Sequence, residues 1–500
     1  MTVKIVKSPH FFSRKRKAVG SIHAGVPSNF PNLLLLCVIL VSCAPLPAKS
    51  PPPVVAKPEL QQTLNAVAGD PAFGHATLPA RAWWSEFNDK KLDALVETAI
   101  QGSPTLATAQ ARIDQARQSA RLVELETGFR FSSDALVARQ HISENGLFPP
   151  PLGGATLNEG DISVGASYTL DWWGKNRALL QSAVGERRAA EAERGAAELT
   201  LAGEVADAYF NWQDVAARMK LTQQAVDKRR TELQLAGARL KRGIDSALVA
   251  SQMEVLLVQE QDNLKDLETQ SRVLRNRISA LTGNGPDWGA RLEEPALTPG
   301  TVFPLPQKLP LDSLAHRPDL VALKWRIDSA ASQIEGAQAD FYPNVDLNLL
   351  LGLQSLDLDN WLKAKSWYGS FGPAVHIPLF NVRTLRSNLG MREAEYAEAA
   401  AQYNQTLIMA ASQVADALTR VSTLDARERL QHSATISAER SQHLQAERFK
   451  SGLSDRLPVL DGEIAALAQH ARESKLQADR KRAMATLFVA LGGGYEPSKE

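Results

Sequence analysis

The pattern of apolar and polar positions predicts two helices far longer than those of ordinary domains. One runs from about Gly174 to Arg242 and the other from about Asn381 to Ser451; both are rich in Ala, Glu, Arg and Gln and contain no proline. A continuous helix of this length spans roughly 100 Å at about 1.5 Å per residue. Such a rod cannot be buried in one globule, so we expect it to pack along its length against other helices.

Four other segments alternate apolar with polar residues, which is the period of a two-faced strand. The pattern predicts strands at about 129–138, 161–171, 344–354 and 367–378. Each is close to the roughly ten residues that a tilted membrane strand requires. Between the first two strands, the Pro- and Gly-containing stretch 141–161 is predicted to be a long surface loop.

The same order of elements occurs twice, which indicates a tandem repeat. Val205-Ala206-Asp207-Ala208 recurs as Val414-Ala415-Asp416-Ala417, a shift of 414 − 205 = 209, and the glycines that end the rods, Gly243 and Gly452, also differ by 452 − 243 = 209. A second helix follows each glycine. We predict a first repeat over 81–283, an equatorial connector over 284–315, a second repeat over 316–493 and a tail over 494–500. Asp207 and Asp416 lie mid-rod, where a charge usually faces water, and we assign them no function.

Four strands cannot close into a barrel, and an open sheet leaves unpaired edges that neither lipid nor solvent tolerates. Three copies would supply 3 × 4 = 12 strands and would align the long helices around a lumen. The predicted fold class is therefore mostly α with a membrane β-part. It is a trimeric 12-stranded β-barrel continuous with a long α-barrel, and the turns at Gly243 and Gly452 lie at the end opposite the strand loops.

Composition excludes several classes of protein. Charged residues make up 22% of the chain, hydrophobic residues 44%, and the net charge is +1, so no nucleic-acid partner is indicated. The apolar run Leu33–Val41 follows a basic segment that includes Arg14–Lys17. It is shorter than the about 20 residues that span a bilayer, and the order of the two segments is that of a secretory signal, predicted over 1–42.

The signal ends at Leu40-Val41-Ser42-Cys43, which resembles the bacterial lipoprotein signal. We expect Cys43 to be acylated and to become the first residue of the mature chain, which then holds no second cysteine for a disulfide. A buried or free cysteine is the alternative. Residues 43–80, which begin with a proline-rich stretch, are predicted to be a lipid-anchored tether.

Catalytic and metal-binding patterns are missing from the sequence. The nine histidines show no His-Glu-x-x-His spacing, and neither Cys-x-x-Cys nor Gly-x-x-x-x-Gly-Lys-Ser/Thr occurs. We expect no enzyme activity, no metal and no cofactor.

Several short motifs together resemble one known family, the outer-membrane factors. These are the TolC-like exit ducts of tripartite efflux and type I secretion systems. The motifs are the lipoprotein signal, Trp83-Trp84, His316-Arg317-Pro318-Asp319-Leu320, Phe341-Tyr342-Pro343, Pro378-Leu379-Phe380 and the two Arg-x-x-x-Gly phrases at Arg239–Gly243 and Arg448–Gly452. The resemblance covers nearly the whole mature chain.

The resemblance implies a homotrimer with its barrel in the outer membrane and its α-barrel in the periplasm. The predicted Cys43 acylation places the chain near the lipoprotein branch that serves resistance-nodulation-division (RND) pumps. The implied partners are a periplasmic adaptor (membrane fusion) protein, an inner-membrane RND-type transporter and outer-membrane lipid. The function expected from it is a passive conduit that carries small toxic compounds outward. A type I protein secretion duct and a poreless periplasmic coiled-coil scaffold remain alternatives.

The resemblance also implies roles for residues near the two turns. Leu453, Leu457 and Asp461, spaced as one helical face, match the family's closed periplasmic gate, where three carboxylates would form a ring. From spacing alone, Asp461 is more often a solvated helix residue. The first-repeat counterparts, which lack charge, are Ile244, Leu248 and Gln252.

The turns themselves are expected to dock the adaptor. The residues concerned are Arg239, Lys241, Gly243, Lys450 and Gly452. The glycines should adopt a left-handed backbone that reverses the chain. For the three cations, helix capping is an equally good interpretation, because positive charge is favourable at a helix C-terminus.

Overall fold

The computed structural model describes residues 54–56, 58–59, 62, 81–296 and 311–496. Every residue described belongs to one compact unit, Leu46–Glu500. The predicted signal 1–42, Cys43, most of the tether 43–80, part of the connector 284–315 and part of the tail 494–500 lie outside the described residues, so those predictions stay predictions.

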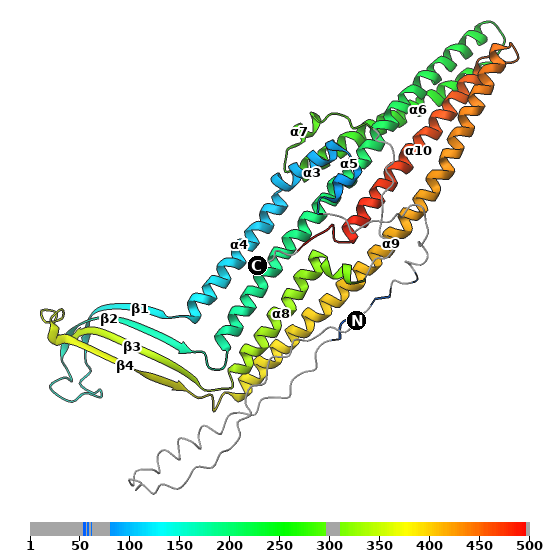
Figure 1. Ribbon diagram of the computed structural model, residues 1–500. Coiled ribbons are helices and arrows are strands. Elements are labelled where there is room, and N and C mark those ends of the chain that lie inside the picture. The colour runs from blue at the N-terminus through cyan, green and yellow to red at the C-terminus, as the bar shows by residue number, and fades with distance from the viewer. Residues whose placement is uncertain (1–53, 57, 60–61, 63–80, 297–310, 497–500) are drawn as a thin grey trace, which may run out of the picture. The chain divides into compact units, whose positions relative to one another are not determined.

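The elements form two series, each of which contains two strands followed by a long helix and a shorter helix (Figure 1). The short 3-10 helix η1 (Trp83–Phe87) leads into the first series and η2 (Leu311–His316) into the second. The first series is α3 (Lys90–Gly102), α4 (Pro104–Thr127), β1 (Arg130–His141), β2 (Thr156–Leu170), α5 (Lys175–Lys241), α6 (Ala247–Leu281) and α7 (Pro286–Ala290). The second is α8 (Pro318–Ala339), β3 (Asn344–Ser355), η3 (Ala364–Ser366), β4 (Trp367–His376), α9 (Val382–Lys450) and α10 (Leu457–Ala490).

Two helices are exceptionally long, as the sequence predicts. α5 has 67 residues and α9 has 69, and each lies within one residue of its predicted bounds. At the start of α5 the Asp171 carboxylate accepts hydrogen bonds from the backbone N–H groups of Asn176 and Arg177, both at 3.0 Å. A carboxylate at this end satisfies donors that have no partner within the helix.

The four strands form one antiparallel sheet in the order β1-β2-β3-β4. The pairing between the two halves of the chain lies at its centre, where Val164 of β2 faces Leu351 of β3. The predicted loop 141–161 is shorter than expected, because β1 continues to His141 and pairs there with Thr156. The predicted fourth strand is also too long: β4 ends at His376, two residues early.

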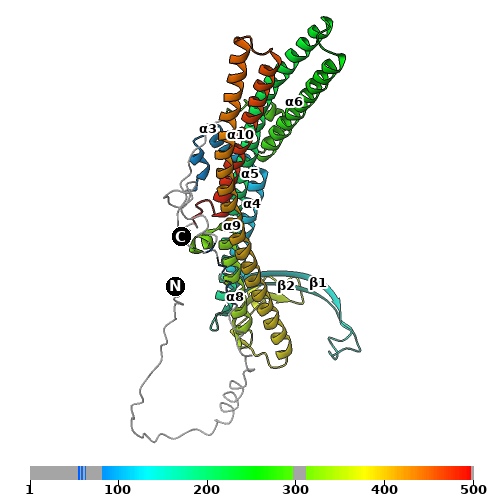
Figure 2. The ribbon, with the colours of Figure 1, turned by 90° about the vertical axis from the view of Figure 1, so that its right-hand side faces the viewer.

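The helices pack side by side rather than as a globular bundle. α5 contacts α6 on one side and α10 on the other, and α10 in turn contacts α9. Near the sheet, α5 contacts α4 and α8, and α8 contacts α9 (Figures 1 and 2). None of the helices within the described ranges combines the length and the apolar character needed to cross a membrane.

An aromatic core joins the start of the chain to the long helices. Trp83, fully buried, contacts Phe488 of α10 with 5.7 Å between ring centroids, and Phe87 contacts Phe210 of α5 at 4.7 Å. The tryptophan pair Trp83-Trp84 therefore belongs to the hydrophobic core.

The segment His316–Leu320 binds the C-terminal end of α10. The Arg317 guanidinium donates to the Ala490 carbonyl at the end of α10 (2.8 Å) and pairs with Asp319 (2.8 Å). The last carbonyls of a helix lack partners within it, so this arginine closes the end of α10.

Candidate functional site

The two hairpin turns share one backbone geometry. Gly243 and Gly452 have φ angles of 72° and 70°, the left-handed region that favours glycine. After α5, the N–H of Ile244 donates to the Arg239 carbonyl (3.0 Å) and the N–H of Gly243 to the Leu240 carbonyl (2.9 Å). The corresponding bonds after α9 link Leu453 to Arg448 and Gly452 to Phe449, both at 2.9 Å. Both helices thus end in a Schellman motif, and the expected left-handed glycines are confirmed.

The predicted helical face of the gate is only partly correct. Leu453 lies in the turn, because α10 does not begin until Leu457, where Asp455 accepts a hydrogen bond from the Leu457 N–H (3.2 Å). Only Leu457 and Asp461 therefore share a face of α10. Leu453 is 71% exposed.

The first hairpin repeats this arrangement. Ile244 precedes α6, which begins at Ala247, so it lies outside the helix that carries Leu248 and Gln252. All three side chains are exposed. Both turns therefore present an apolar residue directly after the glycine.

One arginine joins the two turns. Arg239 forms two hydrogen bonds with Asp245 of its own hairpin, at 2.7 and 3.2 Å. Its remaining nitrogen, Nη1, lies 2.9 Å from Oδ2 of Asp455 in the other hairpin. The hydrogen bonds from Arg239 hold the pKa of the Asp245 carboxyl below its usual range.

The other predicted docking cations have simpler surroundings. Lys450 pairs with Glu447 one turn earlier in α9 (2.8 Å), and Lys241 is exposed at the end of α5. Among the described residues, neither lysine contacts the hairpin opposite its own. Of the three cations, Arg239 alone therefore links the two turns there.

Asp461 lies beside an arginine that it shares with a second carboxylate. Nη1 of Arg229 on α5 is 3.3 Å from Asp461 and 2.7 Å from Glu232. The Glu232 side chain is 1% exposed, and burial, with a smaller effect from Asp461, raises the pKa of its carboxyl. The neighbouring pair Lys228–Glu463 also joins α5 to α10. Ion pairs between α5 and α10 therefore continue from the turns along both helices.

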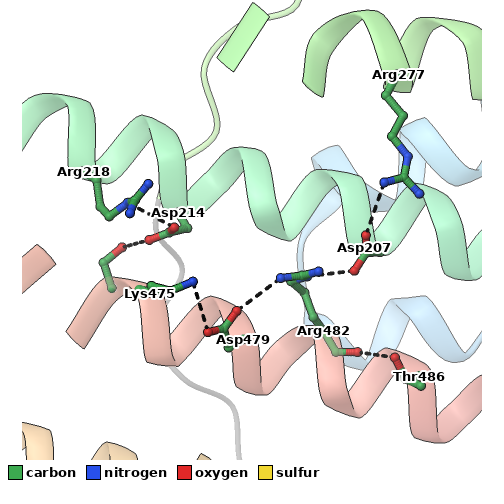
Figure 3. A network of polar contacts seen from close by, with 9 residues as sticks. Asp207, Asp214, Arg218, Arg277, Lys475, Asp479, Arg482 and Thr486 are labelled. Atoms are coloured by element: carbon green, nitrogen blue, oxygen red, sulfur yellow. Dashed lines mark hydrogen bonds and ion pairs between the residues drawn. The ribbon is translucent and has the colours of Figure 1, made fainter. Parts of the chain in front are cut away.

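A second polar network, which the sequence did not indicate, lies midway along α5 (Figure 3). Asp207 accepts from Arg482 of α10 (2.7 Å) and lies 3.7 Å from Arg277 of α6. Further along, Asp214 pairs with Arg218 (3.2 Å) and accepts from Ser474 of α10 (3.2 Å). Asp207 thus connects three helices; its recurrence in the repeated phrase was the only signal, whereas its counterpart Asp416 is exposed.

The described residues form cavities but no metal-binding cluster of side chains. Within 81–296 and 311–496, no three His, Cys, Asp or Glu side chains are placed to hold a metal ion. A cavity of about 700 Å³ lies where the sheet meets the helices, and its charged lining includes the ion pair Lys175–Asp340 (2.6 Å).

Comparison with known proteins identifies the family. The family model "Outer membrane efflux protein" matches residues 95–284 and 309–493. The chain belongs to the outer membrane efflux protein family. Multidrug resistance outer membrane protein MdtQ of Escherichia coli is 31% identical over 480 residues, which cover 93% of this chain and 97% of MdtQ.

Solved structures show the same fold. The outer membrane protein VceC from Vibrio cholerae is 33% identical, with a TM-score of 0.75 over 84% of this chain and all of VceC. The outer membrane channel CmeC of Campylobacter jejuni has a TM-score of 0.81 at 19% identity, covering 92% of this chain and 96% of CmeC, and supports the fold alone.

Membership of the outer membrane efflux protein family confirms the predicted family and the outer-membrane location with a large periplasmic part. The mostly helical architecture with a small sheet is that of these channels. The family and its relatives are channel proteins rather than enzymes.

Proposed function

We propose that three copies of this chain form the outer-membrane exit duct of a tripartite efflux system. The observation that carries the proposal is the open four-stranded sheet, whose edge strands β1 and β4 have no partner strand in the described part of the chain. An unpaired edge cannot remain in lipid, because its N–H and C=O groups would lack partners. Pairing β4 of one copy with β1 of the next closes 3 × 4 = 12 strands into a barrel.

The helices support the same closure. In the described part of the chain, α6 packs mainly against α5 and α7, and α9 packs mainly against α10 and α8. The outer sides of α6 and α9 carry exposed apolar residues, including Val255, Val258, Leu430 and Ile436. Side-by-side packing of copies would cover these surfaces and enclose a water-filled lumen.

The turns form the periplasmic end of the proposed duct. Threefold symmetry would bring three Asp461 carboxylates together, with Leu457 on the same face, and their mutual repulsion would favour cations in a closed gate. The turns at Gly243 and Gly452, with Arg239, Lys241 and Lys450 beside them, would dock the periplasmic adaptor. An inner-membrane RND-type transporter would supply the energy, and acylated Cys43 would add a lipid anchor.

Small toxic compounds are the proposed cargo, because the relatives named for their function are multidrug resistance proteins. A type I secretion duct would share the architecture but carry polypeptides. A poreless coiled-coil scaffold would not explain the four-stranded sheet.

The proposal is tested by reconstituting the purified protein in lipid bilayers and by deleting its gene. We expect trimers with a central channel in electron micrographs, and increased susceptibility of the deletion strain to a panel of toxic compounds that the wild-type gene restores. A protein that is monomeric in detergent and shows no channel would contradict the duct. A deletion that blocks export of a polypeptide while leaving susceptibility unchanged would favour secretion.

A further inference from the structure

A single side chain on α9 holds the N-terminal segment. Asn404 Oδ1 accepts a hydrogen bond from the backbone N–H of Ala56 (2.8 Å), and its Nδ2 donates to the carbonyl of Val54 (2.8 Å). The two partners are some 350 residues away in the sequence. The contact therefore joins the start of the mature chain to the second half of the protein.

The geometry suits an asparagine in particular. In an extended chain, the C=O of one residue and the N–H of the residue two positions later point to the same side. A side-chain amide carries a donor and an acceptor, so it satisfies both groups at once, as a neighbouring strand would. A carboxylate can accept from Ala56 but cannot donate to Val54.

Burial of large side chains does not hold this segment, although Ala56 is half-buried. Val54 is 85% exposed and Val55 is 56% exposed. The hydrogen bonds to Asn404 are thus the specific contacts of residues 54–56. We propose that Asn404 is the docking site for the N-terminal segment and that it sets how far the acylated N-terminus can reach.

The reach follows from two lengths, and this step rests on the proposed function, which puts the membrane at the sheet end of α9. Asn404 is 404 − 382 = 22 residues from the start of α9, or about 33 Å along the helix. From Cys43 to Val54 there are 54 − 43 = 11 residues, which span at most about 36–40 Å. The lipid on Cys43 can therefore reach the bilayer beside its own α9 with only a few ångström to spare.

This match of lengths limits how far from the sheet the docking site can lie on α9. A site one helical turn further from the sheet would add about 5 Å and use up the remaining length. The acyl chain is accordingly confined to membrane close to the protomer that carries it, and the same segment cannot serve a distant site.

The first test measures backbone amide exchange at Ala56 by mass spectrometry in the full-length acylated protein. Asn404→Leu should speed exchange by about fivefold or more, the effect of losing a hydrogen bond of roughly 1 kcal/mol. Gln405→Leu, an exposed amide next to it on α9, is the matched control and should leave exchange unchanged. Equal exchange in the wild type and in Asn404→Leu would overturn the docking site. Amide exchange does not depend on channel activity. A failure of this test can therefore be distinguished from a failure of the proposed duct function.

The second test changes the length of the chain before residue 54. Deleting Pro51–Pro53 shortens the span by about 10 Å, so the inserted lipid should pull the segment from Asn404 and speed exchange at Ala56 to the rate of Asn404→Leu. Inserting three residues at the same place should leave exchange slow. In a Cys43→Ser background the deletion should have no effect, because no lipid holds the N-terminus. Slow exchange in the acylated deletion variant would overturn the limit on reach.

Discussion

Arg239 of α5 binds Asp455 of the α9–α10 turn across a distance of 2.9 Å, while its other nitrogens bind Asp245 of the α5–α6 turn. One guanidinium group therefore fastens together the ends of two hairpins that are separated by more than 200 residues of sequence. Its planar arrangement of donors allows this double engagement, which a lysine ammonium group would not reproduce in the same geometry. Arg239 therefore links the two turns directly.

Arg239→Gln should loosen the two turns and raise ion leak through reconstituted trimers by a few-fold. The pair is partly exposed, so its effect is modest and should weaken further at high salt. Lys450→Gln is the control, because the one ion pair of Lys450 among the described residues is with Glu447 of its own helix. Asp455→Asn should match Arg239→Gln, and the double variant should add little. Equal conductance of Arg239→Gln and Lys450→Gln would contradict the role of this link.

Asp461→Ala should increase ion leak and reduce cation preference. The substitution removes the proposed ring of carboxylates and leaves Arg229 and Glu232 as a neutral pair, so the net negative charge beside the gate is lost. Gln252→Ala, the uncharged first-repeat counterpart, should leave both properties unchanged. Single-channel conductance and reversal potential in a salt gradient measure the two effects. Wild-type values in Asp461→Ala would count against the gate.

Gly452→Leu should abolish export while trimers remain in the outer membrane. A Cβ atom added at Gly452 meets no atom within 4 Å, so the first carbon of the new side chain has open space around it. The cost of the substitution is the left-handed backbone, about 1–2 kcal/mol, together with the bulk that it places on the proposed docking surface.

The control for this turn is Gly237→Leu. Gly237 also has open space around it but lies inside α5 with an ordinary helical backbone. This variant should keep both trimers and export. If Gly452→Leu instead removes the trimers from the membrane, then the glycine is needed for folding rather than for docking.

The elements that the sequence located best are those with a strong local pattern. The bounds of α5 and α9 follow from an uninterrupted absence of proline and from the glycines that end them. Strand periodicity located β1 to β4, although it missed the ends, because ladder pairing at His141 extends β1 beyond its apolar stretch. Local propensity is sufficient for such features.

Local sequence signals place the start of α10 after Leu453. The i, i+4, i+8 spacing places Leu453, Leu457 and Asp461 on one face only if the helix already includes Leu453. Pro458 occupies the first turn of α10, and Asp455 lies just before it, and both are signals of a helix start at Leu457.

The ion pairs between helices could not be predicted from local sequence patterns. Arg239 and Asp455 are 216 residues apart, and Arg229 and Asp461 are 232 apart. Their contact depends on α10 lying next to α5 with a particular rotation about its axis, which a single sequence does not specify. The same is true of Asp207, whose partners come from α6 and α10.

The buried Lys481 should make the free energy of unfolding depend on pH. Its side chain is 4% exposed, donates to Gln213 (3.1 Å) and lies 5.6 Å above the ring of Phe210. Burial lowers the pKa of its ammonium group from 10.5 to about 8, against the opposing effect of nearby Asp89 and Glu428. Below pH 8 the lysine is protonated in both the folded and the unfolded chain, so it adds no slope there.

Between pH 8 and 10.5 the unfolded chain still binds this proton whereas the folded chain has released it, so the free energy of unfolding rises with pH. A shift of 10.5 − 8 = 2.5 units corresponds to a total rise of about 3 kcal/mol. Lys481→Met should remove this rise, which thermal unfolding in detergent across the same pH range can measure. Lys475→Met, at an exposed lysine on the same helix, should retain it. A wild-type protein whose stability is flat in this range would show that Lys481 keeps its proton when folded, and that the buried site solvates the charge better than its surroundings indicate.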